Sequence, residues 1–299
     1  MPANKPFTTE LTDAVMEAAC ESARMNPAGA SLLRFGENAI YGLATLPVVV
    51  RVGRLLAAAE KESQVARWLQ GHKFPAARLA LDFDEPMVID GLPVTFWQKI
   101  DEIFEPITPS EFGTILHDLH RLPPPTDFEL PKFSPMPKVE NRLREIPDGY
   151  LTQYDIKFLH EKFEELAAKY EELTFILPRG PVHGDAHVGN LMRDQNGQIK
   201  LIDFEDFAFG PREWDAAVLS VRHQAFGWVT EDDYQRYVTA YGFDPIAWDG
   251  FPVIRAIREL NMTTWLAQTI GESSGVVTEV RKRISDLRDD QAPRNWRAY

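Results

Sequence analysis

The dipeptide Asn196-Gly197 constrains the fold of this chain more than any other feature, because it lies between two short runs that have the composition of strands. Asn-Gly in that setting is the strongest short-range signal for a β-hairpin with a two-residue turn. Counted outward from such a turn, Asn190 of the first strand faces Asp203 of the second. Facing residues in an antiparallel pair have Cβ atoms roughly 5 Å apart. The hairpin is therefore predicted to bring one amide and one carboxylate together.

Oxygen atoms at Asn190 and Asp203 suit a hard cation such as Mg²⁺, which takes few protein ligands and completes its shell with water and phosphate. A third residue, Asp185, stands five positions before Asn190. The same spacing separates the catalytic Asp from the metal-binding Asn in the H-R-D-x-x-x-x-N motif of protein kinases. Each residue taken alone is better explained by a structural role. Taken together, a base, a metal-binding hairpin and a second carboxylate predict a phosphoryl-transfer site.

Two motifs lie in this stretch, His183-Gly184-Asp185-Ala186-His187-Val188-Gly189-Asn190 and Ile202-Asp203-Phe204-Glu205. They resemble the HGDxxxxN and IDxE motifs of the aminoglycoside phosphotransferase family, which includes antibiotic kinases, choline kinases and other small-molecule kinases. The resemblance implies an α+β, two-lobed protein-kinase-like fold. Its N-terminal antiparallel-sheet lobe, at residues 1–101, would bind the nucleotide, and its larger, mainly helical lobe, at residues 102–299, would bind the acceptor and carry the catalytic residue.

The same resemblance implies roles for the motif residues. Asp185 would orient or deprotonate the acceptor hydroxyl, while Asn190 and Asp203 would hold Mg²⁺ on the phosphates of ATP. Asp215 resembles a buried structural Asp of the family, and His120 is interpreted as a structural hydrogen-bonding residue rather than a catalyst.

Several residues of the N-terminal part are candidates for nucleotide binding. Gly36 and Asn38 belong to a turn in which small residues would let backbone N–H groups approach the phosphates, although a plain hairpin explains the same pattern. Arg51 lies where kinases carry the phosphate-binding Lys of the third strand. Glu62 resembles the helix glutamate that pairs with that cation, and the alternative is a solvated helix charge.

A further contact with the nucleotide is expected at the hinge between the lobes. Gln98 and Ile100 end a predicted strand that leads into the acidic segment 101–106. The backbone there would hydrogen-bond the adenine base. No side-chain motif specifies the base, so the expectation that the nucleotide is ATP rests on the resemblance alone.

Composition limits the classes of partner and the cellular compartment that we expect for this protein. The chain has 299 residues, with 44% hydrophobic and 26% charged residues, as in soluble globular proteins long enough for two lobes. Its net charge of -13 argues against nucleic acid. The single cysteine, Cys20, excludes an internal disulfide, and neither a signal peptide nor a membrane-spanning run is visible. We expect a cytoplasmic protein with a small-molecule partner; the oligomeric state is left open.

Apolar periodicity predicts helices along the chain, the clearest at residues 8–24 and 155–173. Residues 74–79 are expected to form a strand and Ser110 to cap the first helix of the C-terminal half. The Arg/Asp-rich residues at the end of the chain are expected to be loose. Further helices are predicted at residues 57–70, 216–226, 232–241 and 253–270.

The acceptor is expected to be small, because only a short segment follows Asp203 where a protein kinase carries a long activation loop. Acidic residues behind the metal site favour an aminoglycoside, a choline-like molecule or another amino alcohol. The alternative to an enzyme is a catalytically silent nucleotide-binding regulator. Residues that could contact the acceptor, with core or surface roles as the alternative, are Arg222, His223, Glu259 and Trp265.

Overall fold

The computed structural model describes residues 6–297, and their contacts divide the chain into two compact units. The first unit contains the described residues up to Ile107, together with Pro125–Leu130 and Val188–Phe207. The second contains Thr108–Pro124, Pro131–His187 and the described residues from Ala208 onward. No helix within residues 6–297 has the length and apolar character needed to cross a membrane.

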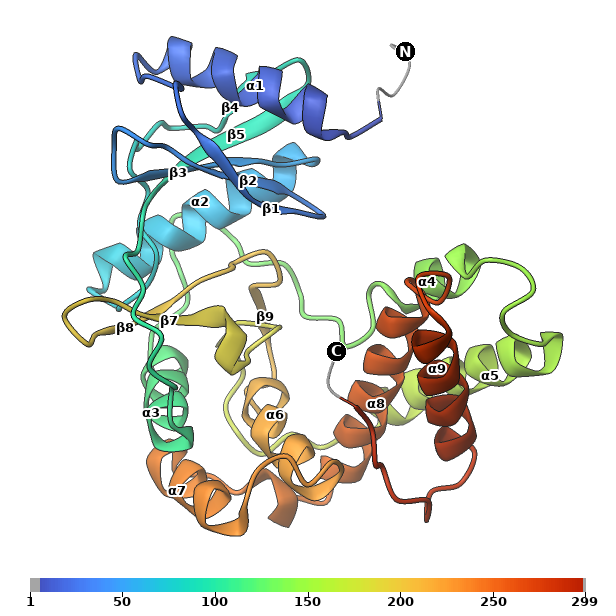
Figure 1. The fold of residues 1–299 in the computed structure, drawn as a ribbon. Helices are drawn as coiled ribbons and strands as arrows, with labels where there is room; N and C mark the ends of the chain where they lie inside the picture. Colours follow the sequence, from blue (N-terminus) through green and yellow to red (C-terminus); the bar gives the residue numbers. More distant parts are fainter. Residues whose placement is uncertain (1–5, 298–299) are drawn as a thin grey trace. The chain divides into compact units, whose positions relative to one another are not determined.

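The first unit is built on a five-stranded antiparallel sheet of order β1-β2-β3-β5-β4 (Figure 1). One face is covered by helix α1 (Thr9–Ser22), which begins at the N-cap Thr8 and buries an apolar stripe against the sheet. Helix α2 (Leu56–Gly71) packs beside β5. The strands are β1 (Ser31–Phe35), β2 (Ala39–Gly42), β3 (Val48–Val52), β4 (Met87–Ile89) and β5 (Leu92–Gln98).

The alternating side-chain directions along β3 decide where the side chain of Arg51 points. Val50 and Val52 belong to the core cluster that α1 covers. Because successive side chains of a strand point to opposite faces, Arg51 between them faces the other side of the sheet. Its strand neighbours are Ile40 and Thr95. The sheet thus delivers Arg51 away from the α1 core, to the side where α2 carries Glu62.

The predicted hairpin forms, but its register differs by one residue from the prediction. Strands β7 (Leu191–Arg193) and β8 (Ile199–Leu201) pair Leu191 with Leu201. The Asp194 carboxylate accepts hydrogen bonds from the N–H groups of Asn196 and Gln198, both at 2.9 Å, and so holds a loop longer than two residues. Gly197 has φ 77°, a conformation that an L side chain would strain. Asn190 is therefore not opposite Asp203, and the N–H of Ile202 donates to its carbonyl instead.

The second unit is mainly helical, with one small sheet of β6 (Gly180–Val182) and β9 (Ala208–Gly210). Its core joins α8 and α9 to the residues around Trp214. The helices are α3 (Pro109–His120), α4 (Val139–Glu145), α5 (Gln153–Glu171), α6 (Glu213–Gln224), α7 (Glu231–Tyr241), α8 (Phe251–Ala267) and α9 (Ser274–Leu287), and the short 3₁₀ turns of the chain are η1 (Val188–Asn190) and η2 (Pro245–Ala247).

Three local predictions are wrong. Residues 74–79 form only isolated bridges at Ala76 and Leu79 rather than a strand. Thr108, not Ser110, caps α3, because Pro109 occupies the first helical position and Glu111 completes a capping box with Thr108. The described residues after α9, up to residue 297, are not loose: Arg294 and Trp296 are both buried.

Candidate functional site

The first unit contains a cluster of charged side chains around Arg51. Its guanidinium forms an ion pair with Glu62 of α2 and approaches the Glu205 carboxylate at 3.5 Å. Lys61 donates a hydrogen bond to the Glu205 carbonyl. The predicted partnership of Arg51 and Glu62 is therefore present, and Glu205 and Lys61 are members that were not predicted. Only the fold reveals them, because residue 205 is distant from residue 51 in sequence.

Glu62 is the most perturbed member of this cluster. Burial raises the pKa of its carboxyl, Arg51 and Lys61 lower it, and the charges of Asp203 and Glu205 raise it, for a net pKa of about 7. The Glu62 side chain is 4% exposed. Three carboxylates thus share the cluster with two cations, which leaves one negative charge uncompensated when Glu62 is ionised. Such a surplus fits the binding of a divalent cation.

Asn190 and Asp203, the two predicted metal ligands, precede Glu205 of this cluster in the sequence. Asn190 is buried and ends η1, whereas Asp203 is exposed and has φ 63°. A positive φ is costly for a residue other than glycine and recurs at functional sites, although Asp tolerates it better than most. Since neither residue belongs to a regular strand, the hairpin alone does not set their directions. Their oxygen atoms fit Mg²⁺, so they remain our proposed ligands.

No cluster of three or more His, Cys, Asp or Glu side chains within residues 6–297 is arranged to hold a metal ion. A magnesium site of one amide and one carboxylate, completed by phosphate and water, does not require such a cluster.

The predicted phosphate-binding turn joins β1 to β2. The Gly36 N–H donates to the Asn38 carbonyl at 3.0 Å. Arg54 donates to the carbonyls of Gly36 and Glu37, at 3.1 and 3.0 Å, and its guanidinium lies 3.9 Å from the ring centre of Phe7. A Cβ at Gly36 would meet no atom within 4 Å, so the turn is open on that side. Arg54 was not predicted, and it holds this turn in shape.

Gln98 and Ile100 lie where β5 ends. The Gln98 N–H donates to the Arg78 carbonyl at 2.8 Å. The Ile100 N–H has no hydrogen-bond partner within the described part of the chain, which leaves it available to a nucleotide base. Beyond it, the Ile103 N–H donates to the Arg193 carbonyl at 2.9 Å. The predicted hinge segment is thus held against the β7–β8 hairpin inside the first unit.

In the second unit, Asp185 stands on a loop after β6, with its side chain 55% exposed. The His187 Nε2 atom lies 3.4 Å from its Oδ2 atom. Desolvation raises the pKa of Asp185. The His187 hydrogen bond and the charges of His187, His183 and Arg258 outweigh this effect and lower the pKa to about 2. Asp185 is therefore ionised at neutral pH and accessible to a ligand.

The loop that carries Asp185 is held by its backbone. Asp215 of α6 accepts hydrogen bonds from the N–H groups of His183, at 2.6 Å, and Gly184, at 3.0 Å. Gly184 has φ 85°, so the Arg that protein kinases carry at this position would be strained. His120 lies between Asp215, at 3.1 Å, and the Tyr241 hydroxyl, at 2.8 Å. His120 and Asp215 thus have the hydrogen-bonding roles expected for them.

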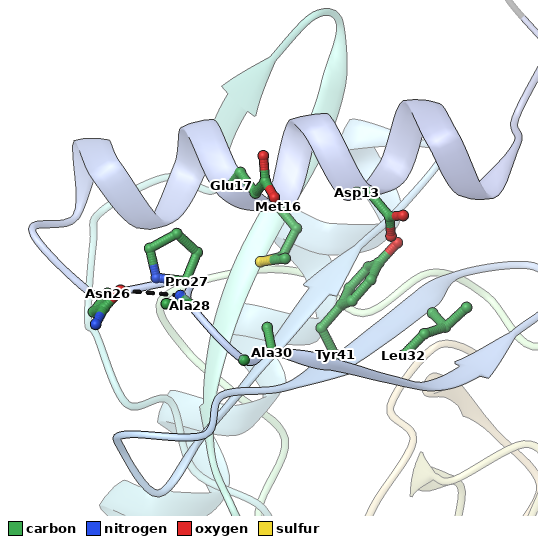
Figure 2. A pocket seen from close by; sticks show the side chains of 10 residues that line it. Asp13, Met16, Glu17, Asn26, Pro27, Ala28, Ala30, Leu32 and Tyr41 are labelled. Atoms are coloured by element: carbon green, nitrogen blue, oxygen red, sulfur yellow. Dashed lines mark hydrogen bonds between the residues drawn. The ribbon is translucent and has the colours of Figure 1, made fainter.

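A hollow of the first unit lies elsewhere. It has a volume of about 560 Å³ between α1 and the edge formed by β1 and β2 (Figure 2). Asp13, Met16, Glu17 and Tyr41 line it. None of the predicted site residues contributes to this hollow, so we assign it no role in the chemistry.

Comparison with known proteins identifies the family. The model of the phosphotransferase enzyme family matches residues 37–256, well over half of the chain. The chain belongs to this family. The match includes Asp185, Asn190 and Asp203, so the resemblance noted in the sequence is confirmed. No curated protein sequence matches the chain.

Solved structures of small-molecule kinases share the fold of this family member. An amicoumacin kinase in complex with AMP-PNP, Ca²⁺ and its ligand is 14% identical, with a TM-score of 0.73 over 97% of this chain and 98% of that one. A spectinomycin phosphotransferase with ADP and spectinomycin is 13% identical, with a TM-score of 0.62 over 97% and 98%. A choline kinase from Streptococcus pneumoniae is 13% identical, with a TM-score of 0.65 over 93% and 98%. The α+β protein-kinase-like fold is confirmed.

Proposed function

We propose that this member of the phosphotransferase enzyme family uses ATP and Mg²⁺ to phosphorylate a hydroxyl group of a small molecule. The observation that carries the proposal is the Asp185 loop. Asp215 clamps the backbone of that loop, and Asp185 itself is ionised and exposed. An ionised carboxylate accepts a hydrogen bond from an alcohol and orients its oxygen for attack.

With a pKa of about 2, Asp185 is a weak base, so it aligns the hydroxyl and takes the proton only as the new bond forms. A loose phosphoryl-transfer transition state is compatible with such late proton transfer. Arg51, held by Glu62, would hold the phosphates of ATP. Asn190 and Asp203 would hold Mg²⁺, which when bound neutralises charge on the transferred phosphoryl group. The amicoumacin kinase neighbour, crystallised with AMP-PNP and Ca²⁺, supports this choice of nucleotide and cation.

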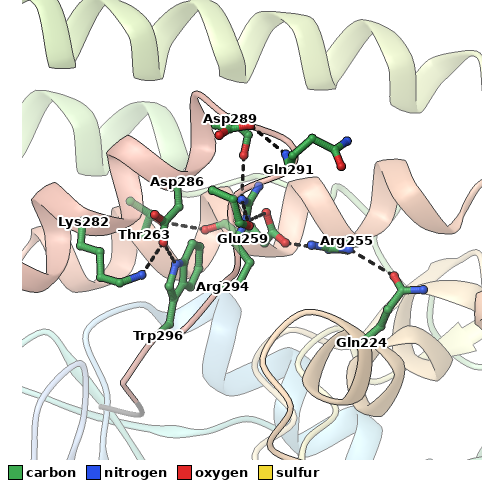
Figure 3. Close-up of polar contacts among 11 residues, drawn as sticks. Gln224, Arg255, Glu259, Thr263, Lys282, Asp286, Asp289, Gln291, Arg294 and Trp296 are labelled. Carbon is green, nitrogen blue, oxygen red and sulfur yellow. Dashed lines mark hydrogen bonds and ion pairs between the residues drawn. The ribbon is translucent and has the colours of Figure 1, made fainter.

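The hypothesis of an amino alcohol acceptor relied on acidic residues of the C-terminal half, and the structure gives the buried ones other partners. Glu213 accepts hydrogen bonds from the N–H groups of Ile176 and Leu177, at 2.7 and 2.6 Å. Glu259 is paired with Arg255, at 2.8 Å, and Arg294, at 3.0 Å (Figure 3). These carboxylates therefore lend no support to an amine-bearing acceptor, and we limit the proposal to a small alcohol.

A transfer assay tests the proposal. Purified protein is incubated with ATP, MgCl₂ and a panel of small alcohols, and the release of ADP is followed against samples that contain EDTA. We expect ADP release that depends on Mg²⁺ and on at least one alcohol. Nucleotide binding without ADP release, for every alcohol tested, would favour the catalytically silent regulator instead.

A further inference from the structure

The surroundings of Asp185 contain two arginines that the reaction described above does not use, Arg222 of α6 and Arg258 of α8. We propose that Arg222, together with Arg258, binds an anionic group of the acceptor alcohol, a carboxylate or a phosphate, beside Asp185. This inference builds on the proposed phosphotransferase function and names the class of its acceptor.

The position of Arg222 follows from the helix that carries it. Asp215 and Arg222 are seven residues apart on α6, so their side chains leave the helix within about 20° of each other and about 10 Å apart along the axis. Asp215 contacts the backbone of His183 and Gly184 directly. Helix side chains lean toward the N-terminus, which brings the long Arg222 side chain back toward this contact. The face of α6 that holds the Asp185 loop therefore also presents Arg222.

Arg258 approaches the same loop through Trp214. Its guanidinium lies 4.2 Å from the ring centre of Trp214 and donates a hydrogen bond to the Trp214 carbonyl. The Trp214 indole N–H donates to the Gly184 carbonyl at 2.7 Å, one residue before Asp185. The Nε–H group of Arg258 is buried and has no hydrogen-bond partner within residues 6–297. An unsatisfied donor on a fixed guanidinium is costly unless a ligand meets it.

Arg222 interacts with Asp185 only through its charge. Its half-buried side chain makes no hydrogen bond and no ion pair with the residues that the structure describes. Other basic residues near the end of α6 are engaged: His223 stacks on Tyr234 and lies 3.2 Å from Glu231, and Arg255 pairs with Glu259. Arg222 is thus the basic side chain of this helix end that remains available to a ligand.

The lack of a paired carboxylate favours an anion. Desolvation lowers the pKa of both guanidinium groups, to about 10 for Arg258; the negative charges of Asp215 and Asp185 partly offset the effect for Arg258, and that of Asp185 does so for Arg222. Asp215 is already bonded to His120 and to two backbone N–H groups. Neither guanidinium forms an ion pair within residues 6–297. A guanidinium matches the geometry of a carboxylate or a phosphate and can bind either with two hydrogen bonds.

Ligand-observed NMR on the full chain tests the inference. AMP-PNP and Mg²⁺ are added in excess, so that phosphate probes do not report on the nucleotide site. The first matched set is glycerol, 3-amino-1,2-propanediol, glycerate and glycerol 3-phosphate, and the second is glucose, glucosamine, gluconate and glucose 6-phosphate. The carboxylate and phosphate members show which anion is preferred. We expect an anionic member to bind about tenfold more tightly than its neutral and amine counterparts.

Variants assign the preference to Arg222. Arg222→Gln should weaken binding of the anionic probe about tenfold, while Arg222→Lys, which keeps the charge, should retain part of the preference. Arg236→Gln removes one exposed arginine from α7 and should leave the preference unchanged. Equal or better binding of neutral or amine probes, absence of binding by every anionic probe, or an unaltered preference in Arg222→Gln would each overturn the inference. Failure of AMP-PNP to bind in these samples would instead count against the phosphotransferase proposal.

Discussion

Glu62 provides a quantitative test of the charged cluster around Arg51. Burial is the largest influence on this carboxyl and raises its pKa from the ordinary 4.5 to about 7. Between these values, the folded protein holds the Glu62 proton and the unfolded chain has lost it. Since the unfolded state binds fewer protons in this window, the free energy of unfolding must fall as the pH rises. The loss of unfolding free energy caused by ionising Glu62 is absent below pH 4.5 and complete above about pH 7.

The expected magnitude follows from the same two values. One pKa unit corresponds to about 1.4 kcal/mol, so Glu62 alone should lower the free energy of unfolding by about 2.5 kcal/mol between about pH 5 and about pH 8. Glu62→Gln cannot ionise and should lose this part of the pH dependence. Loss of the ion pair with Arg51 changes its absolute stability, so the slopes with pH are compared rather than the stabilities themselves.

Urea unfolding followed by tryptophan fluorescence, at a series of pH values and in EDTA without nucleotide, measures these slopes. Glu161→Gln serves as the matched control, because it removes one carboxyl from an exposed face of α5. We expect this control to have the slope of the wild type and Glu62→Gln to have a flatter one. If the curves of the wild type and Glu62→Gln run parallel between about pH 5 and about pH 8, burial does not oppose the ionisation of Glu62 and the reasoning fails.

Asp185→Asn should fold and bind ATP, but lower transfer by about 10²- to 10⁴-fold, because the amide cannot take the hydroxyl proton; wild-type turnover would exclude Asp185 from the mechanism. Asp203→Ala should nearly abolish Mg²⁺-dependent nucleotide binding, measured by calorimetry, and Asn190→Ala should raise the Mg²⁺ concentration for half-maximal rate. Asp203→Asn tolerates φ 63° as Asp does, so equal loss in both Asp203 variants assigns the effect to charge and not to strain. Arg294→Met should lower the free energy of unfolding by about 3 kcal/mol, because buried Glu259 loses a partner; an unchanged urea midpoint would contradict this.

The elements that the sequence predicts best are those with a long apolar period. Helix α1 follows the predicted stripe of Val15, Met16, Ala19 and Cys20, all of which are buried. Helix α5 lies within two residues of its predicted bounds. Periodicity succeeds here because each helix buries one continuous face, and the pattern of that face is visible in a single segment. Short strands without alternation, such as the predicted strand at residues 74–79, lack this signal.

The hairpin shows a limit of local pattern. Asn196-Gly197 marks the turn correctly, yet the loop has an extra residue because the Asp194 side chain binds two backbone N–H groups within it. A dipeptide signal does not reveal this competing side-chain contact. The consequence is not small, since a one-residue change of register alters which residues oppose each other along the whole pair. The argument from facing positions at Asn190 and Asp203 fails for this reason.

Contacts between distant segments were beyond the reach of the sequence. The motif residues Asp185 and Asp215 could be recognised, because their spacing resembles that of a family. The partners that tune them, among them Arg258, come from other elements and carry no motif. The end of the chain shows the same effect: its charged composition predicts a loose tail, but Arg294 and Trp296 are buried against α8 and α9 by Glu259 and Asp286.

The acceptor illustrates why net charge does not predict a site. The chain carries a formal charge of -13, which is compatible with a cationic substrate, and acidic residues behind the metal site were the reason to expect one. Surface acids act over a Debye length of about 8 Å at physiological ionic strength and are screened beyond it. A group within the site instead responds to its nearest desolvated neighbours, and around Asp185 these include Arg222 and Arg258. Net charge therefore does not decide which ligand a site selects, and the proposed anionic alcohol is compatible with an acidic protein.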